Sequence, residues 1–102
     1  MLKKRFLKNG RVRVTFCLPD AIVADAKEAY LVGDFNNWNE HATPMARLEN
    51  GGFEVTLRLE QHRDYQFRYL VNNCQWHCDW DADRYVASPM AGNNAIISTY
   101  PE

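Results

Sequence analysis

Strict alternation of apolar and polar residues is the feature that most constrains this chain. In segment 11–18 the apolar members are Val12, Val14, Phe16 and Leu18. Segment 53–60 has the same pattern, with apolar members Phe53, Val55, Leu57 and Leu59. Successive side chains of a strand point to opposite faces of a sheet, so a period of two predicts strands with one buried face. No segment has a long apolar stripe at helical spacing, and the chain is therefore predicted to be an all-β protein.

Turn residues separate the predicted strands. Asn9-Gly10 and Asn50-Gly51 are hairpin dipeptides, and Pro19 ends the first long strand. Further strands are expected over residues 27–33, 45–48, 65–71 and 95–99. Segment 20–26 is too short for an independent helix and is expected to be a connector. Six or seven short strands with regularly spaced turns predict an immunoglobulin-like β-sandwich.

The length of 102 residues sets the domain organisation. A chain of this size buries about two thirds of its unfolded surface, which is enough for one hydrophobic core. The sequence contains no internal repeat, low-complexity tract or linker composition. Residues 1–102 are therefore expected to form a single domain.

The charge balance argues against two classes of partner. Twelve basic and 13 acidic residues give a net charge of -1, and the sequence pI is about 6.3. A nucleic-acid-binding domain usually has a pI above about 9, so we expect no nucleic-acid partner. No apolar run approaches the ~18 residues of a membrane span, and the cationic start at Lys3 to Arg5 lacks a signal-peptide core. We therefore expect no membrane contact and a cytoplasmic location.

The three cysteines, Cys17, Cys74 and Cys78, indicate reduced thiols rather than a disulfide framework, because a secreted domain normally has a denser, even set. Cys74, His77 and Cys78 form a compact group of zinc-type ligands. A fourth ligand would have to come from Cys17, His41 or His62, which belong to no paired motif. We expect incidental thiols here, with neither a metal nor a cofactor.

Motifs for catalysis are also missing. Glycoside hydrolysis needs two carboxyl groups about 5–10 Å apart across a cleft. The clustered acids Asp79, Asp81 and Asp83 occupy alternate positions of one segment and are expected to be solvated. They do not fit a calcium loop either, since Arg84 and Met90 stand where glycine and glutamate are required. The chain is expected not to be an enzyme, and no catalytic residue is assigned.

Several motifs together resemble a known family. They are Tyr30-Leu31-Val32-Gly33-Asp34-Phe35-Asn36-Asn37-Trp38, then segment 65–72, then Gln75-Trp76, then Gly92-Asn93-Asn94-Ala95-Ile96-Ile97. In this order and spacing the chain resembles the glycogen-binding and isoamylase N-terminal carbohydrate-binding modules. These early-set β-sandwiches occur beside α-glucan debranching and branching enzymes and in the β subunit of AMP-activated protein kinase. The resemblance covers roughly residues 27–99 and implies binding of α-1,4-glucan such as glycogen or starch.

The resemblance also implies which residues bind the glucan. By position these are Trp38, Arg68, Trp76, Met90 and Asn94. The chemistry is suitable, since indoles offer flat platforms for sugar rings while arginine and asparagine offer hydrogen bonds to hydroxyl groups. The alternation around Arg68 independently predicts that this side chain lies outside the core.

Two interpretations remain at this stage. In the first, the chain binds α-glucan and has a glucan-processing enzyme as a second partner. In the second, it keeps the fold without sugar binding and docks a protein or a second copy of itself through a sheet edge or an aromatic patch. Exposed indoles beside Arg68 and Asn94 would favour the first interpretation. Burial of either indole under Trp80 or Tyr85 would favour the second.

Overall fold

The computed structural model describes residues 2–19, 21, 26–72, 75–79, 82–87 and 92–100. In this part of the chain the elements are strands and one 3-10 turn, as the alternation predicts. They are β1 (Leu2–Phe6), β2 (Arg11–Leu18), β3 (Ala29–Gly33), η1 (Asp34–Asn36), β4 (Ala46–Arg47), β5 (Phe53–Glu60), β6 (Asp64–Val71), β7 (Gln75–His77), β8 (Arg84–Ala87) and β9 (Asn93–Ser98). Among these residues no helix is long and apolar enough to span a membrane.

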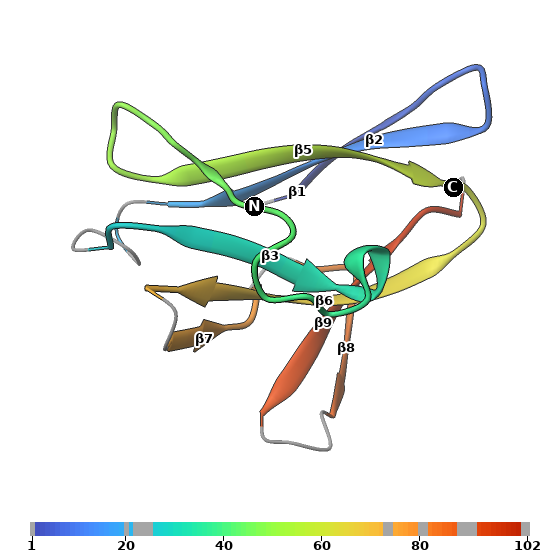
Figure 1. Cartoon of the computed structure of the whole chain (residues 1–102). Helices are drawn as coiled ribbons and strands as arrows, with labels where there is room; N and C mark the ends of the chain where they lie inside the picture. The colour runs from blue at the N-terminus through green and yellow to red at the C-terminus, as the bar shows by residue number, and fades with distance from the viewer. Residues whose placement is uncertain are drawn as a thin grey trace.

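The strands form two antiparallel sheets that face each other (Figure 1). Sheet A has the order β1-β2-β5-β4. Sheet B has the order β3-β6-β9-β8, and β7 pairs with β6 outside this path. Two stacked antiparallel sheets around a shared core confirm the predicted immunoglobulin-like β-sandwich.

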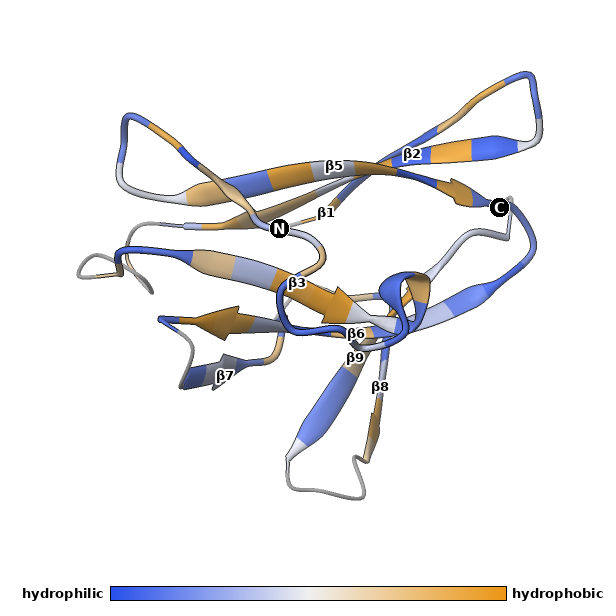
Figure 2. Ribbon diagram, in the orientation of Figure 1, coloured by the Kyte–Doolittle hydropathy of each residue, from blue (hydrophilic) through white to orange (hydrophobic). Residues whose placement is uncertain are grey.

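The core lies between the sheets and follows the alternation in the sequence. Figure 2 shows hydrophobic and hydrophilic residues alternating along β2 and β5. Phe16 of sheet A meets Phe67 of sheet B edge-to-face, with ring centroids 5.1 Å apart, and also contacts Phe35 at 5.7 Å. Burying a phenylalanine contributes about 1.5–3 kcal/mol, and an aromatic pair adds about 0.5–1.5 kcal/mol. These rings therefore hold the two sheets together.

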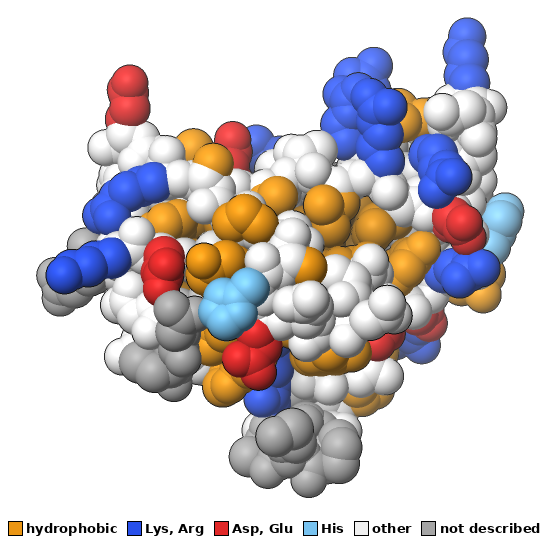
Figure 3. All heavy atoms as spheres, viewed as in Figure 1, with side chains coloured by type: hydrophobic (Ala, Val, Ile, Leu, Met, Phe, Trp, Pro, Cys, Tyr) orange, Lys and Arg blue, Asp and Glu red, His pale blue; other side chains and the backbone are white. Residues whose placement is uncertain are grey.

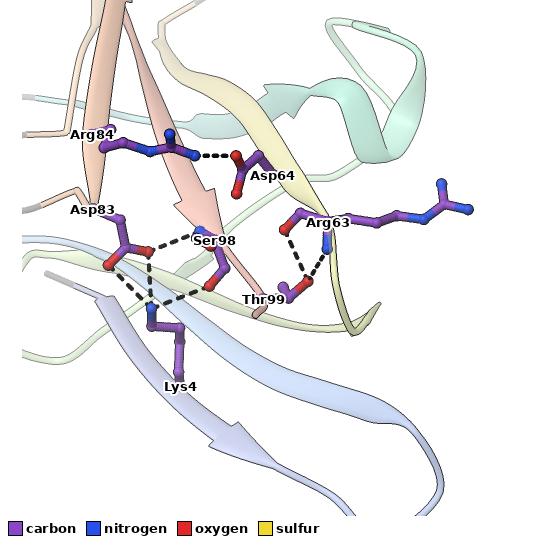
Figure 4. Close-up of polar contacts among 7 residues, drawn as sticks. All are labelled: Lys4, Arg63, Asp64, Asp83, Arg84, Ser98 and Thr99. Carbon is purple, nitrogen blue, oxygen red and sulfur yellow. Dashed lines mark hydrogen bonds and ion pairs between the residues drawn. The ribbon is translucent and has the colours of Figure 1, made fainter. Parts of the chain in front are cut away.

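Polar contacts join the sheets at one edge (Figure 4). The Lys4 ammonium of β1 lies 2.9 Å from the Asp83 carboxylate, which precedes β8, and donates to the Ser98 carbonyl at 3.2 Å. The same carboxylate accepts the Ser98 backbone N–H at 2.8 Å. The two charged side chains are 21% and 33% exposed, so this pair contributes at most about 1 kcal/mol and mainly fixes the alignment of the edge.

The structure contains more strands than the six or seven predicted. β7 and β8 were not expected, because segments of three and four residues are too short for a period-two pattern to stand out. β9 begins at Asn93, two residues before the predicted strand start at Ala95. Most of the expected connector over 20–26 lies outside the described residues.

A buried polar pair interrupts the otherwise apolar core. The Tyr69 hydroxyl donates to the Asp79 carboxylate at 2.6 Å, and both residues are buried. The prediction that Asp79 is solvated is therefore wrong. Burial, followed by the negative charge of Asp79, raises the pKa of Tyr69 far above its usual value of about 10. Since a buried carboxylate is costly without donors, this hydroxyl stabilises the position of Asp79.

Replacing this hydroxyl makes a testable change in stability. We expect Tyr69→Phe to lower the free energy of unfolding at pH 7 by about 1–3 kcal/mol, because Asp79 loses a buried donor. In the wild type, the unfolded tyrosine ionises above pH 10 while the folded one stays protonated. Stability should therefore fall by up to about 1.4 kcal/mol per pH unit above pH 10, and Tyr69→Phe should remove this part of the slope.

Urea unfolding of both proteins between pH 7 and 11 measures the two effects. Tyr30→Phe is the matched control, since it removes a hydroxyl from a half-buried tyrosine on a different strand. Equal slopes above pH 10 for the wild type and Tyr69→Phe would contradict the interpretation.

Candidate functional site

Strand β6 has one face in the core and one face outside it. Its core-facing side chains are Tyr65, Phe67, Tyr69 and Val71. Gln66, Arg68 and Leu70 point the other way, which agrees with the prediction for Arg68. Register then defines the outer face of sheet B, which carries Tyr30, Val32, Gln66, Arg68, Leu70, Trp76, Asn94 and Ile96.

This outer face has an apolar floor. Val32, Leu70 and Ile96 are 0%, 1% and 6% exposed although they point away from the core between the sheets. Other side chains on the same side of the sheet must therefore cover them. Such a floor gives the polar and aromatic side chains above it a firm base, because closely packed side chains have few alternative rotamers.

Trp76 is the most exposed aromatic residue on this face. It belongs to β7, lies opposite Leu70 of β6 in the register, and is 43% exposed. Pairing with the central strand fixes its backbone, and a tryptophan side chain has only two torsions. The indole therefore exposes a flat apolar surface, and its side chain has little conformational freedom to lose.

Trp38 is held by Asp34, a residue that the sequence analysis did not assign to the site. The Trp38 indole N–H donates to Asp34 Oδ1 at 2.8 Å. The second carboxylate oxygen accepts the backbone N–H of Gln66 at 2.8 Å. Asp34 thus ties the half-buried indole to strand β6. The sequence offered one signal for this role of Asp34, which is its position four residues before Trp38 in a predicted turn. The contact of Asp34 with Gln66 on β6 cannot be deduced from spacing.

The turn that contains Trp38 is also fixed by its own backbone. Asn37 and Trp38 both have a φ of 57° in the left-handed region, and the Trp38 N–H donates to the Gly33 carbonyl at 2.9 Å. The Asn36 amide donates to the Leu31 carbonyl at 2.9 Å and accepts the Gly33 N–H at 3.1 Å. Asparagine suits such a turn because its side chain replaces backbone hydrogen bonds.

Gly33 is required where β3 meets β6. A Cβ atom there would collide with the Gln66 carbonyl and would lie 2.8 Å from the Cβ of Phe67. The φ of Gly33 is extended, so the reason is space and not backbone conformation. Glycine lets the turn that carries Trp38 lie directly against the central strand.

Arg68 and Asn94 lie close together, but they differ in accessibility. The Arg68 Nε donates to the Asn93 carbonyl at 3.2 Å, and its side chain is half-buried. Asn94 is only 7% exposed, and its amide donates to the Gln66 side chain at 3.0 Å. Asn94 is thus placed to hold the Gln66 side chain, and little of its own surface is accessible. The fifth residue, Met90, lies outside the described residues.

The described cysteines are Cys17 on β2 of sheet A and Cys78, which follows β7. Cys17 and Cys78 are not joined in a disulfide, and Cys74 lies outside the described residues. Burial raises the pKa of Cys78, and the guanidinium of Arg68 only partly opposes this shift. The Cys78 thiol is therefore protonated at neutral pH and is a weak nucleophile. Within the described ranges, no group of three or more histidine, cysteine or acidic side chains could hold a metal ion.

The two tryptophans are connected to the central strand at different points. Trp38 is tied to β6 at Gln66, and Trp76 lies opposite Leu70, so their attachment points are four residues, or about 13 Å, apart along the strand. Arg68 lies midway between these points. Figure 1 shows η1 near one end of β6 and β7 at the other. A hydrogen-bond donor thus lies between the attachment points of the two tryptophans.

The family model described as carbohydrate-binding module 48 (isoamylase N-terminal domain) matches residues 23–91. The chain belongs to this family, which confirms the resemblance read from the motifs.

Two relatives show where such modules occur. The chain is 37% identical over 71 residues to the β-1 subunit of 5'-AMP-activated protein kinase of Sus scrofa, covering 70% of this chain and 53% of the relative. It is 56% identical over 32 residues to the chloroplastic/amyloplastic 1,4-alpha-glucan-branching enzyme 2-2 of Arabidopsis thaliana, covering 31% of this chain and 4% of that enzyme. The chain thus spans about half of one relative and a small part of the other.

Removing the Asp34 carboxylate tests how Trp38 is held. We expect Asp34→Ala to make the Trp38 indole proton exchange with water at least several-fold faster, because the proton loses its acceptor. Solvent-exchange NMR of the indole resonances measures this rate, with Trp38→Phe assigning the signal. Asp83→Ala is the matched control, since Asp83 also accepts a backbone N–H but lies near β1. An unchanged rate in Asp34→Ala would contradict the assigned role.

Proposed function

We propose that this chain is a non-catalytic α-glucan-binding module that stacks glucosyl units on Trp38 and Trp76. The observation that carries the proposal is the exposed indole of Trp76 on the same sheet face as Arg68, with Trp38 tied to the same strand. Membership of a carbohydrate-binding family supports it. The names of the relatives, one a 1,4-alpha-glucan-branching enzyme, indicate α-glucan as the class of carbohydrate.

The chemistry of a glucose ring fits these side chains. Each ring has an apolar C–H face, which an indole can cover, and a rim of hydroxyl groups, which need fixed donors and acceptors. Arg68 offers guanidinium N–H groups, while Gln66 and Asn94 form a bonded amide pair beside it. A shallow site of this kind typically binds with a Kd between micromolar and millimolar, or about -8 to -4 kcal/mol.

The remaining parts of the proposal rest on the family resemblance. Met90, by its position in the family motif, contributes an apolar contact to the glucan. A glucan-processing enzyme is the second partner, and the module acts in the cytoplasm as one domain over residues 1–102. None of the residues named here has a catalytic role in this proposal.

Titration with a soluble glucan tests the site. Maltoheptaose and β-cyclodextrin are added to the wild type and to Trp38→Ala and Trp76→Ala, and binding is followed by calorimetry. We expect saturable binding in the wild type and at least about a tenfold loss of affinity in each variant, because each removes one stacking platform.

The matched control is Tyr100→Ala, which removes an exposed aromatic ring that packs against His62 in the segment between β5 and β6. It should bind glucan as the wild type does. Absence of heat in the wild type up to about 10 mM ligand, or equal affinity in all four proteins, would contradict the proposal. The fold would then serve protein docking instead.

A further inference from the structure

The outer face of sheet A carries a row of three arginines. Core-facing residues of β2 and β5 are buried, so their alternate residues point outward. In the register, Arg5 of β1 lies opposite Arg13 of β2, and Arg13 lies opposite Arg58 of β5. All three are exposed. We call Arg5, Arg13 and Arg58 the arginine row.

The arginine row is unfavourable for folding. Neighbouring strands are about 4.8 Å apart, and like charges directly opposite on one sheet face destabilise it. Within the described residues, the ion pairs on this face join Glu60 to Arg11 at 4.0 Å and to Arg63 at 3.0 Å, and none reaches the row. A local arrangement that opposes stability is a common mark of a functional surface.

Charge is distributed unevenly between the two sides of the molecule. The outer face of sheet A holds five of the 12 basic residues, which are Lys3, Arg5, Arg11, Arg13 and Arg58, and two of the 13 acidic ones, Glu54 and Glu60. This face therefore has a net charge of +3 in a chain of net charge -1. Lys and Arg side chains gather over the β1–β2 side in Figure 3.

We propose that the arginine row docks an acidic polypeptide segment of a partner protein. A guanidinium is a planar fork that binds carboxylates in bidentate pairs, and three forks in line match carboxylates along an extended chain. The row spans only about 10 Å over three strands. A negative net charge opposes binding of long polyanions and anionic membranes, which need a broad basic field.

This surface lies on the opposite side of the sandwich from the outer face of sheet B, so glucan and partner can bind together.

The test uses a fluorescein-labelled hexaglutamate peptide and fluorescence anisotropy at low salt. We expect saturable binding to the wild type, at least about a tenfold loss in Arg13→Gln, and weakening as salt is added. Lys27→Gln is the matched control, because it makes the same charge change at an exposed lysine away from sheet A. It should change affinity less than twofold. A hexaglutamine peptide should not bind.

Thermal stability provides a second measurement. Replacing a residue with a merely structural role would lower the Tm, whereas replacing a residue of the arginine row should raise it. Arg13→Gln should raise the Tm, by about 2 °C, because it removes the central charge of the row while it weakens peptide binding. Arg5→Gln should act in the same direction and serves if Arg13→Gln fails to fold.

Four results would overturn the proposal. They are absence of hexaglutamate binding up to 1 mM, equal binding by wild type and Arg13→Gln, a lower Tm in both arginine variants, and tighter binding of an RNA oligonucleotide or of phosphatidylserine vesicles than of the peptide.

Discussion

The alternation of side chains along strand β6 is the constraint on which both the fold and the proposed site depend. On one face, Phe67 packs edge-to-face against Phe16 and joins the sheets. On the other face, Arg68 and its neighbours stand above an apolar floor. A shift of register by one residue would exchange these faces, so the core packing that stabilises the sandwich also fixes which side chains can meet a ligand.

Segments next to β6 in the fold bring both tryptophans to this strand. Asp34 occupies the position where β3 ends, and its carboxylate joins the backbone of β6 to the indole of Trp38. β7 adds Trp76 beside the other end of β6. The central strand therefore aligns two aromatic residues from distant parts of the chain. The outer face of sheet A has a net charge of +3, so the two outer faces of the sandwich differ in chemistry.

Much of the fold could be predicted from the sequence, because β2, β5 and β6 are long enough for the period-two pattern to be clear. The outward direction of Arg68 followed from the same pattern. β7 and β8 could not be predicted, because three or four residues carry too little periodicity. The role of Asp34 was also out of reach, since its partner Gln66 is 32 residues away and is brought near only by the β3–β6 pairing. Burial of Asn94 depends likewise on Gln66 across the sheet.

The most direct test of the account is to map glucan binding residue by residue. Maltoheptaose is titrated into ¹⁵N-labelled protein, and amide and indole shifts are followed by NMR. The account predicts shifts of the Trp38 and Trp76 indoles and of amides along β6, β7 and β9, with little change at Arg13 or Thr15 on sheet A. Shifts confined to sheet A, or none at saturating ligand, would contradict the claim that the outer face of sheet B binds glucan.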